Sequence, residues 1–187
     1  PREIAYFLLI GLGFMFVEIP LIQRLTLFLG HPTYALTVVL AGLLLYSGLG
    51  ALLAGRWGKE KALRLWRWEL MVLCAFLVTL GLGLDALLAT SGDLSTAARI
   101  VLVLIFLAPL GLVMGLPLPL AMLDLGDRDP KGIPWAWAIN GAASVVASVA
   151  ALMLAALWGF RAVFFLALGC YVLAALAARV RDASSEG

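Results

Sequence analysis

Residues Ile133–Trp158 read IPWAWAINGAASVVASVAALMLAALW, a run without a single Asp, Glu, Lys or Arg. Such a run predicts a transmembrane helix, because about 20 apolar residues in helical form cross about 30 Å of hydrocarbon. The chain contains three long intervals free of charge: Arg24 to Arg56, Arg99 to Asp124 and Lys131 to Arg161. The membrane-spanning pattern is therefore repeated along the chain.

The composition agrees with this interpretation. Of the 187 residues, 64% are hydrophobic and only 13% are charged, too few to cover a water-soluble domain of this size with a polar surface. The lipid bilayer is the expected surrounding, and no nucleic-acid partner is expected. We expect no metal or cofactor, since His31 is the only histidine and lies in a predicted turn, while Cys74 and Cys170 fall within spans and are assigned to packing.

We predict an all-α, polytopic membrane protein with six transmembrane helices in residues 1–182, followed by a polar C-terminal tail at 183–187. The helices are separated by short turn sequences rich in Gly, Pro, Asp and Ser. The predicted spans are 4–30, 33–55, 65–89, 96–123, 133–158 and 160–180.

The distribution of basic residues predicts the orientation. Ten of the 13 Lys and Arg residues fall on one side of the predicted spans, including the basic segment from Arg56 to Arg67. Only Arg99 and Arg161 clearly fall on the other side, and Arg24 lies inside the first span. Since short loops rich in Lys and Arg stay in the cytoplasm, both termini should be cytoplasmic.

Glu18 is the costliest residue of the first predicted span, because an ionised carboxylate near the bilayer centre costs a few kcal/mol, about 2.5 to 3.5 on insertion scales. Pro20 follows it and removes a backbone hydrogen bond. Two interpretations stay open: Glu18 is a proton or cation site on a transport path, or it is a buried polar clamp between helices.

Gln23 and Arg24 follow in the outer half of the same span. Asp85 is expected at a comparable depth near the outer end of the third span, which makes Arg24 and Asp85 a possible ion pair. Arg24 alternatively snorkels to the headgroups.

The fifth span carries a stripe of small and polar residues, with Asn140, Ser144 and Ser148 on one helix face. Such stripes let helices approach closely and hydrogen-bond across the contact. Packing is the default interpretation, with Gly111 and Gly115 of the fourth span as matching small residues and a ligand role for Asn140 as the alternative.

The fourth span contains three prolines as well as these glycines: Pro109, Pro117 and Pro119. Bent or broken helices are the means by which transporters expose backbone groups near the midplane. They also occur in inert bundles, where neighbouring helices repair the lost bonds.

Six helices with a basic loop after the second resemble one half of a major facilitator superfamily transporter. Residues Gly50–Lys61 (GALLAGRWGKEK) resemble that superfamily's loop motif, although Gly55 stands where an acid is expected. The resemblance implies a half-facilitator-like bundle that works with a second six-helix half or as a homodimer.

A second resemblance covers most of the chain. Gly11–Gly30 (GLGFMFVEIPLIQRLTLFLG), Gly115–Leu120 (GLPLPL) and Ile133–Ala142 (IPWAWAINGA) resemble the membrane region of bacterial spermidine-synthase-like proteins. In that family, facilitator-like helices follow a soluble Rossmann domain of the aminopropyltransferase type. The resemblance implies that this chain is a fragment or split product lacking the enzyme domain, and we expect no enzymatic activity from it.

Two functions from different classes follow. The chain is a transporter-like half, with polyamine or another small cation as cargo and Glu18 and Asn140 on the path. Alternatively, it is a non-catalytic structural or accessory membrane subunit that anchors a larger complex.

Overall fold

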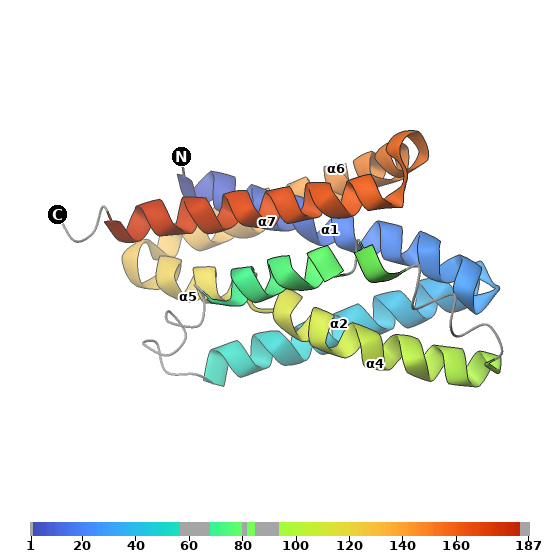
Figure 1. Ribbon diagram of the computed structural model, residues 1–187. Helices are drawn as coiled ribbons and strands as arrows, with labels where there is room; N and C mark the ends of the chain where they lie inside the picture. Colours follow the sequence, from blue (N-terminus) through green and yellow to red (C-terminus); the bar gives the residue numbers. More distant parts are fainter. Residues whose placement is uncertain (1, 57–67, 80–81, 85–93, 184–187) are drawn as a thin grey trace.

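The computed structural model describes residues 2–56, 68–79, 82–84 and 94–183, and for residues 179–183 the helix alone. Within these ranges the chain is helical and contains no strand (Figure 1). The helices are α1 (Arg2–Leu29), α2 (Pro32–Arg56), an unlabelled helix Trp68–Thr79, α4 (Thr96–Met114), α5 (Pro117–Arg128), the 3-10 turn η1 (Pro130–Gly132), α6 (Ile133–Trp158) and α7 (Phe160–Ala183). The all-α expectation is confirmed.

Helix α1 is the centre of the bundle. It packs against α6, α7 and α2, and its buried residues lie on several sides of the helix, including Tyr6, Ile10, Val17 and Leu25. Pro20 lies inside α1 without ending it, since the helix continues to Leu29. A helix that is apolar all round is expected where neighbours cover it on more than one side.

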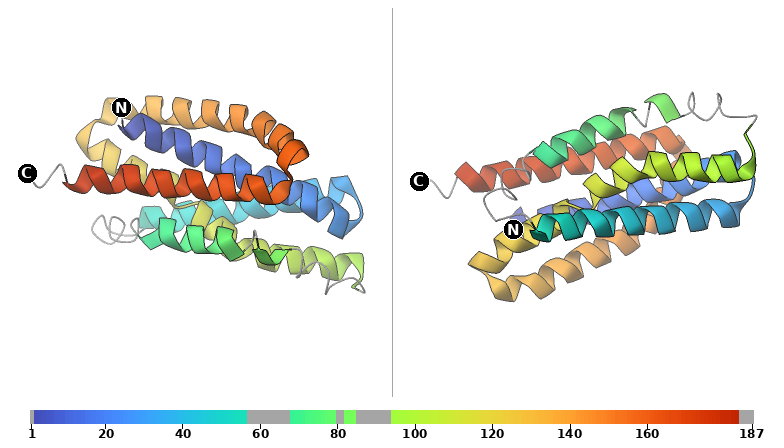
Figure 2. Two further views of the ribbon diagram at one scale, coloured as in Figure 1. Left: turned by 45° about the horizontal axis from the view of Figure 1, so that its top comes forward. Right: turned by 90° about the horizontal axis from the view of Figure 1, so that it is seen from below.

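The helices alternate in direction, so that their ends gather at the two ends of the bundle (Figure 2). The start of α1, the end of α2, the end of α5 and the end of α7 lie together, which brings Arg2, Arg56 and Arg128 to one end. Arg99 of α4 and Arg161 of α7 lie at the opposite end. This grouping of the described cations agrees with the sequence-based assignment of two sides.

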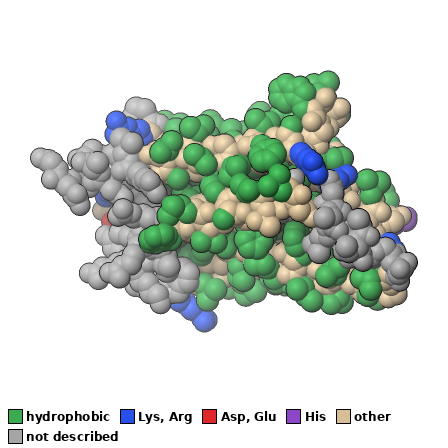
Figure 3. All heavy atoms as spheres, in the orientation of Figure 1, with side chains coloured by type: hydrophobic (Ala, Val, Ile, Leu, Met, Phe, Trp, Pro, Cys, Tyr) green, Lys and Arg blue, Asp and Glu red, His purple; other side chains and the backbone are tan. Residues whose placement is uncertain are grey.

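Five helices in the described ranges are long and apolar enough to cross a membrane, when α4 with α5, and η1 with α6, are each taken as one span. On the face shown in Figure 3, hydrophobic side chains cover the middle of the bundle and basic side chains lie toward its ends. This distribution of side chains is typical of an integral membrane protein.

The predicted third span, 65–89, is described only in part. The helix Trp68–Thr79 is apolar but shorter than a span, and Asp85 lies outside the described residues. The six-span count therefore stays a prediction, whereas the spans 4–30, 33–55, 133–158 and 160–180 match α1, α2, α6 and α7 closely.

The predicted fourth span is two helices instead of one. Helix α4 ends at Met114, and α5 begins at Pro117 and continues to Arg128, beyond the predicted end at residue 123. Pro117 has no N–H to donate to the preceding turn, so the helix stops before it and a new one starts with it. The prolines left a bent or a broken helix open, and the structure has the break at residues 115–116.

Glycines allow α2 and α4 to cross at backbone contact. A Cβ atom on Gly50 would lie 2.2 Å from the carbonyl oxygen of Leu112, and one on Gly115 would lie 2.1 Å from the carbonyl oxygen of Ser47. Two further glycines end helices in the left-handed region, Gly30 at φ 75° and Gly159 at φ 81°. They confirm the turns predicted after the first and fifth spans.

Candidate functional site

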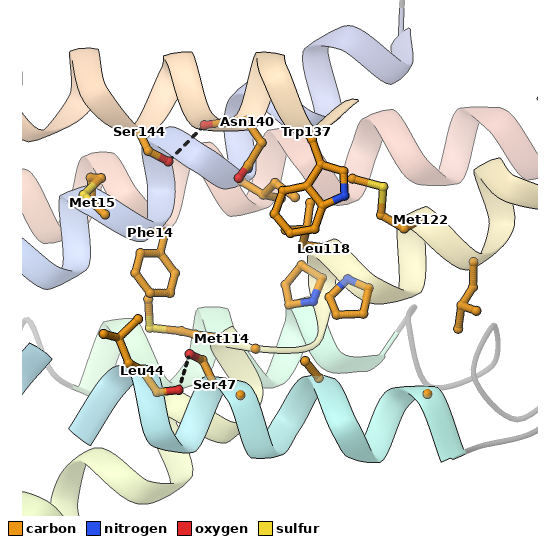
Figure 4. Close-up of a pocket in the computed structure, with 18 of the residues that line it drawn as sticks. Phe14, Met15, Leu44, Ser47, Met114, Leu118, Met122, Trp137, Asn140 and Ser144 are labelled. Atoms are coloured by element: carbon orange, nitrogen blue, oxygen red, sulfur yellow. Dashed lines mark hydrogen bonds between the residues drawn. The ribbon is translucent and has the colours of Figure 1, made fainter. Parts of the chain in front are cut away.

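A cleft of about 740 Å³ opens beside the interruption between α4 and α5. Side chains of α1, α2, α5 and α6 line it, together with Met114 at the end of α4 and Tyr171 of α7. Figure 4 shows Phe14 and Met114 pointing into the space between α2 and the α1–α6 pair, with Trp137 and Met122 on its other side. The cleft thus draws residues from distant parts of the sequence into one volume.

The lining is mainly apolar and carries no ionisable side chain besides the phenol of Tyr171, within the described residues. Its other side-chain hydrogen-bonding groups are those of Ser47, Trp137, Asn140 and Ser144. A volume of this size, apolar with a few polar groups, is typical of sites for small molecules, which are about 300 to 1,000 Å³.

The helix interruption offers few backbone donors to the cleft. Pro117 and Pro119 have no N–H groups, and the N–H of Leu120 donates to the carbonyl of Leu116 at 3.1 Å. A helix N-terminus normally attracts anions through its free N–H groups. Here two of the first three such groups are missing, so the start of α5 is poorly suited to hold a phosphate or carboxylate.

Asn140 and Ser144 tie α6 to α1. The Asn140 Nδ2 donates to the carbonyl of Phe7 at 3.0 Å, and the Ser144 hydroxyl lies 3.4 Å from the carbonyl of Gly11 and 2.9 Å from that of Asn140. A Cβ on Gly11 would lie 2.6 Å from the carbonyl oxygen of Asn140. The two residues therefore serve helix packing, as the default interpretation predicts, and both also border the cleft.

The other residues predicted to serve helix packing differ in the contacts they make. Gly111 and Gly115 lie against α2, where Cβ atoms would meet Tyr46 at 2.7 Å and Ser47 at 2.1 Å. They pack against the second predicted span, not against the stripe on α6. The hydroxyl of Ser148 donates to the carbonyl of Val145 in its own helix at 2.8 Å, so this hydrogen bond makes no link between helices.

Glu18 is buried, with 4% of its surface exposed. It does not belong to the cleft lining, and the described part of the chain shows no hydrogen bond or ion pair from its carboxyl group. A polar clamp between helices would need a partner for Glu18, and none is found among the described residues. A buried, unpaired acid of this kind is expected to carry a proton.

The neighbouring polar residues of α1 point elsewhere. The guanidinium of Arg24 lies over the ring of Phe160, 5.3 Å from its centroid, at the start of α7. The predicted partner Asp85 is outside the described residues, so the ion pair stays a prediction. The side-chain oxygen of Gln23 is buried and has no hydrogen-bond partner among the residues described.

Two contacts hold α5 on α1 beside the cleft. The Tyr6 hydroxyl donates to the carbonyl of Pro117 at 3.2 Å, directly at the interruption. Arg128 pairs with Glu3 at 3.2 Å and also with Asp124. Together they anchor both ends of α5 to the first two turns of α1.

Two buried residues have no counterpart in the sequence-based predictions. Glu69 is 5% exposed, and both its carboxyl oxygens are buried without a hydrogen-bond partner in the described chain. Tyr171 is 1% exposed and borders the cleft. Glu69 lies inside the predicted third span, where an acid can be read from the sequence, but its burial follows only from how its helix packs.

No group of three potential metal ligands occurs among the described residues. Comparisons with models of protein families, with curated proteins and with solved structures give no match. The function is therefore inferred from the geometry of the cleft and the chemistry of its lining.

Proposed function

We propose that this chain is a transporter-like membrane domain that holds a small, neutral, mostly apolar solute in the cleft beside the α4–α5 interruption. The observation that carries the proposal is the cleft itself: about 740 Å³, at a helix break, with an apolar lining and a few hydrogen-bonding groups. Irregular backbone at membrane depth is tolerated where it is buried in protein or lines a cavity.

The lining favours a neutral solute over the polyamine or other small cation expected from the sequence. A polyamine carries several positive charges, and burying them is costly unless carboxylates pair with them. The aromatic rings of Phe14 and Trp137 in the lining attract a cation but do not neutralise several charges. No carboxylate lines the cleft within the described residues, and Glu18 lies outside it. An anion is equally unsuited, because the prolines at the start of α5 remove donors.

The proposal includes a half-facilitator-like bundle of six spans in the bacterial inner membrane. The alternating helices, and the cleft bordered by α1, α2, α5 and α6, support it. Alternating access needs a second half, so the working unit is a homodimer or a pair with another six-helix subunit. A soluble Rossmann domain, as implied by the resemblance, is a further expected partner.

A photoreactive neutral alcohol, azioctanol, tests the site. We expect its adducts in nanodisc-embedded protein to concentrate on cleft residues such as Met114 and Met122. Gly48→Phe should abolish this concentration, because a Cβ on Gly48 meets nothing within 4 Å and the ring would fill the cleft. Leu52→Phe is the matched control on the same helix, since Leu52 is 65% exposed.

Two outcomes contradict the proposal. Adducts spread evenly over the lipid-facing surface, and unchanged in Gly48→Phe, would show that the cleft holds no solute. Protection of the cleft by spermidine, with no effect of octanol, would establish a cationic cargo in place of a neutral one.

The second candidate function is an accessory subunit that docks to a larger complex. Helix α6 favours it, because Trp135, Val145 and Leu157 are each at least 70% exposed and a Cβ on Gly141 would meet nothing within 4 Å. Lipid covers such a face equally well. Stable co-purification of a partner that is lost in Gly141→Trp, with azioctanol labelling of the cleft absent, would support this role.

A further inference from the structure

Glu69 lies on the buried face of the helix Trp68–Thr79. Leu70, Leu73 and Leu77 of this helix are at most 1% exposed and belong to the hydrophobic core, and Glu69 lies one turn before Leu73. Both oxygens of its carboxyl group are buried, and neither has a hydrogen-bond partner in the part of the chain that the structure describes. The carboxyl is therefore buried beside apolar core residues and, within the part of the chain that the structure describes, makes no hydrogen bond or ion pair.

The helix that carries Glu69 runs beside α7 (Figures 1 and 2), and Glu69 lies within electrostatic range of Tyr171. Two further titratable groups of the described chain lie within electrostatic range of Tyr171: the thiols of Cys170 on α7 and of Cys74 on Glu69's own helix. Both cysteines are free and half-buried. A phenol and two thiols are neutral near pH 7 and supply no charge to balance a carboxylate.

Tyr171 connects this cluster to the cleft. Its side chain belongs to the cleft lining, and its ring lies against α1, where a Cβ on Gly13 would come within 2.9 Å of it. The absence of a side chain at Gly13 gives the ring its place between α1 and α7. Tyr171 thus borders the solute cleft and lies on the helix next to the one that carries the buried acid.

We propose that Glu69 is a proton-binding site inside the helix bundle, linked to the cleft through Tyr171. An ionised carboxylate without a partner is disfavoured in an apolar interior, whereas a protonated one is neutral and needs only one acceptor. The inference does not depend on the proposed solute, because the proton is detected with the cleft empty.

Infrared spectroscopy of the purified protein in lipid nanodiscs tests the inference. At neutral pH, we expect the carbonyl stretch of protonated carboxyl groups, which moves on exchange into D2O. Glu69→Gln removes one component of this signal and Glu69→Asp shifts it, while Glu18→Gln removes a separate component. Glu3→Gln is the control, because Glu3 pairs with Arg128 and its side chain is 40% exposed.

A separate variant tests the link between Glu69 and the cleft. Tyr171→Phe keeps the ring against Gly13 and removes only the hydroxyl, so the Glu69 component should shift in frequency, whereas Tyr34→Phe, on an exposed tyrosine of α2, leaves it in place. An identical Glu69 component in Tyr171→Phe would overturn the link.

A folded Glu69→Gln protein that retains the complete wild-type signal would show that Glu69 is ionised and would overturn the proton site. If Glu69→Gln does not fold, wild-type protein labelled with ¹³C at the glutamate carboxyls gives the same answer. A protonated glutamate component that remains after Glu18→Gln supports the proposal. Its absence overturns the proposal.

Discussion

Asn140 shows how one polar side chain can fix the position of a whole transmembrane helix. Its amide donates to the Phe7 carbonyl, 133 residues away in the sequence, in a region where lipid offers no alternative partner. Interhelical hydrogen bonds of this kind contribute about 0.6 kcal/mol on average and up to about 1.7 kcal/mol. The bond therefore supports the α1–α6 contact without dominating it.

We expect Asn140→Ala to lower the free energy of unfolding by about 0.6 to 1.7 kcal/mol, because it removes this bond. Unfolding in mixed micelles with increasing SDS, followed by circular dichroism, measures the change. Ser148→Ala is the matched control on the same helix, since the Ser148 hydroxyl bonds within α6. Equal losses in both variants would contradict a specific role of the Asn140 bond.

The sequence predicts the polar face of this site but not its partners. Asn140 and Ser144 stand out by their helical spacing among small residues, whereas nothing in the sequence relates them to the carbonyls of Phe7 and Gly11. Any helix with an accessible backbone satisfies such donors equally well. Glu69 escapes prediction for a related reason, because its burial depends on how its helix packs in the bundle.

At the scale of helices, the junction of α4 and α5 is where local sequence decides most. Pro117 and Pro119 dictate that no helix continues through residue 116, and the structure breaks there. Pro20 and Pro109 lie inside continuous helices, because neighbouring turns adjust to a single missing bond. Which proline ends a helix therefore depends on its combination with other breakers, here Gly115 and Pro119.

The α2–α4 crossing provides a sharp test at this scale. Gly50→Ala would place a Cβ 2.2 Å from a backbone oxygen of Leu112, and we expect a loss of about 1 to 3 kcal/mol, the usual cost of overpacking. Thermal unfolding in detergent, followed by tryptophan fluorescence, measures it. The neighbouring Met114 and the cleft should also be displaced, so azioctanol labelling should fall.

Gly48→Ala is the control for this crossing, two residues earlier on the same helix. Its Cβ would meet nothing within 4 Å, so stability should be unchanged or slightly higher, since alanine favours a helix over glycine by about 0.5 to 1 kcal/mol. A Gly50→Ala protein as stable as Gly48→Ala would show that the two helices are farther apart than described.

At the scale of the whole molecule, the spans follow from the sequence and their arrangement does not. Long apolar runs bounded by turn sequences predict α1, α2, α6 and α7 within a few residues. The central place of α1 cannot be read in the same way, because every predicted span is similarly apolar and lipid does not distinguish their faces. Contacts such as Gly13 with Tyr171 decide it, and they form only in the folded bundle.

The charge distribution predicts which end of the bundle faces the cytoplasm. Arg2, Arg56 and Arg128 gather at one end of the described structure, and short basic loops resist translocation. We therefore expect a cysteine at Asp127, near this end, to be inaccessible from outside the cell. A cysteine at His31, in the exposed turn at the other end, should be accessible.

Asp127→Cys and His31→Cys, each in a background carrying Cys74→Ala and Cys170→Ala, allow the comparison with a membrane-impermeant maleimide. Intact cells should label His31→Cys alone, and permeabilised cells should label both. Both positions are exposed, so a difference between them reports the membrane barrier and not burial in the protein. The reverse pattern would place the basic end outside the cell, and labelling of both in intact cells would contradict the three crossings predicted between residues 31 and 127.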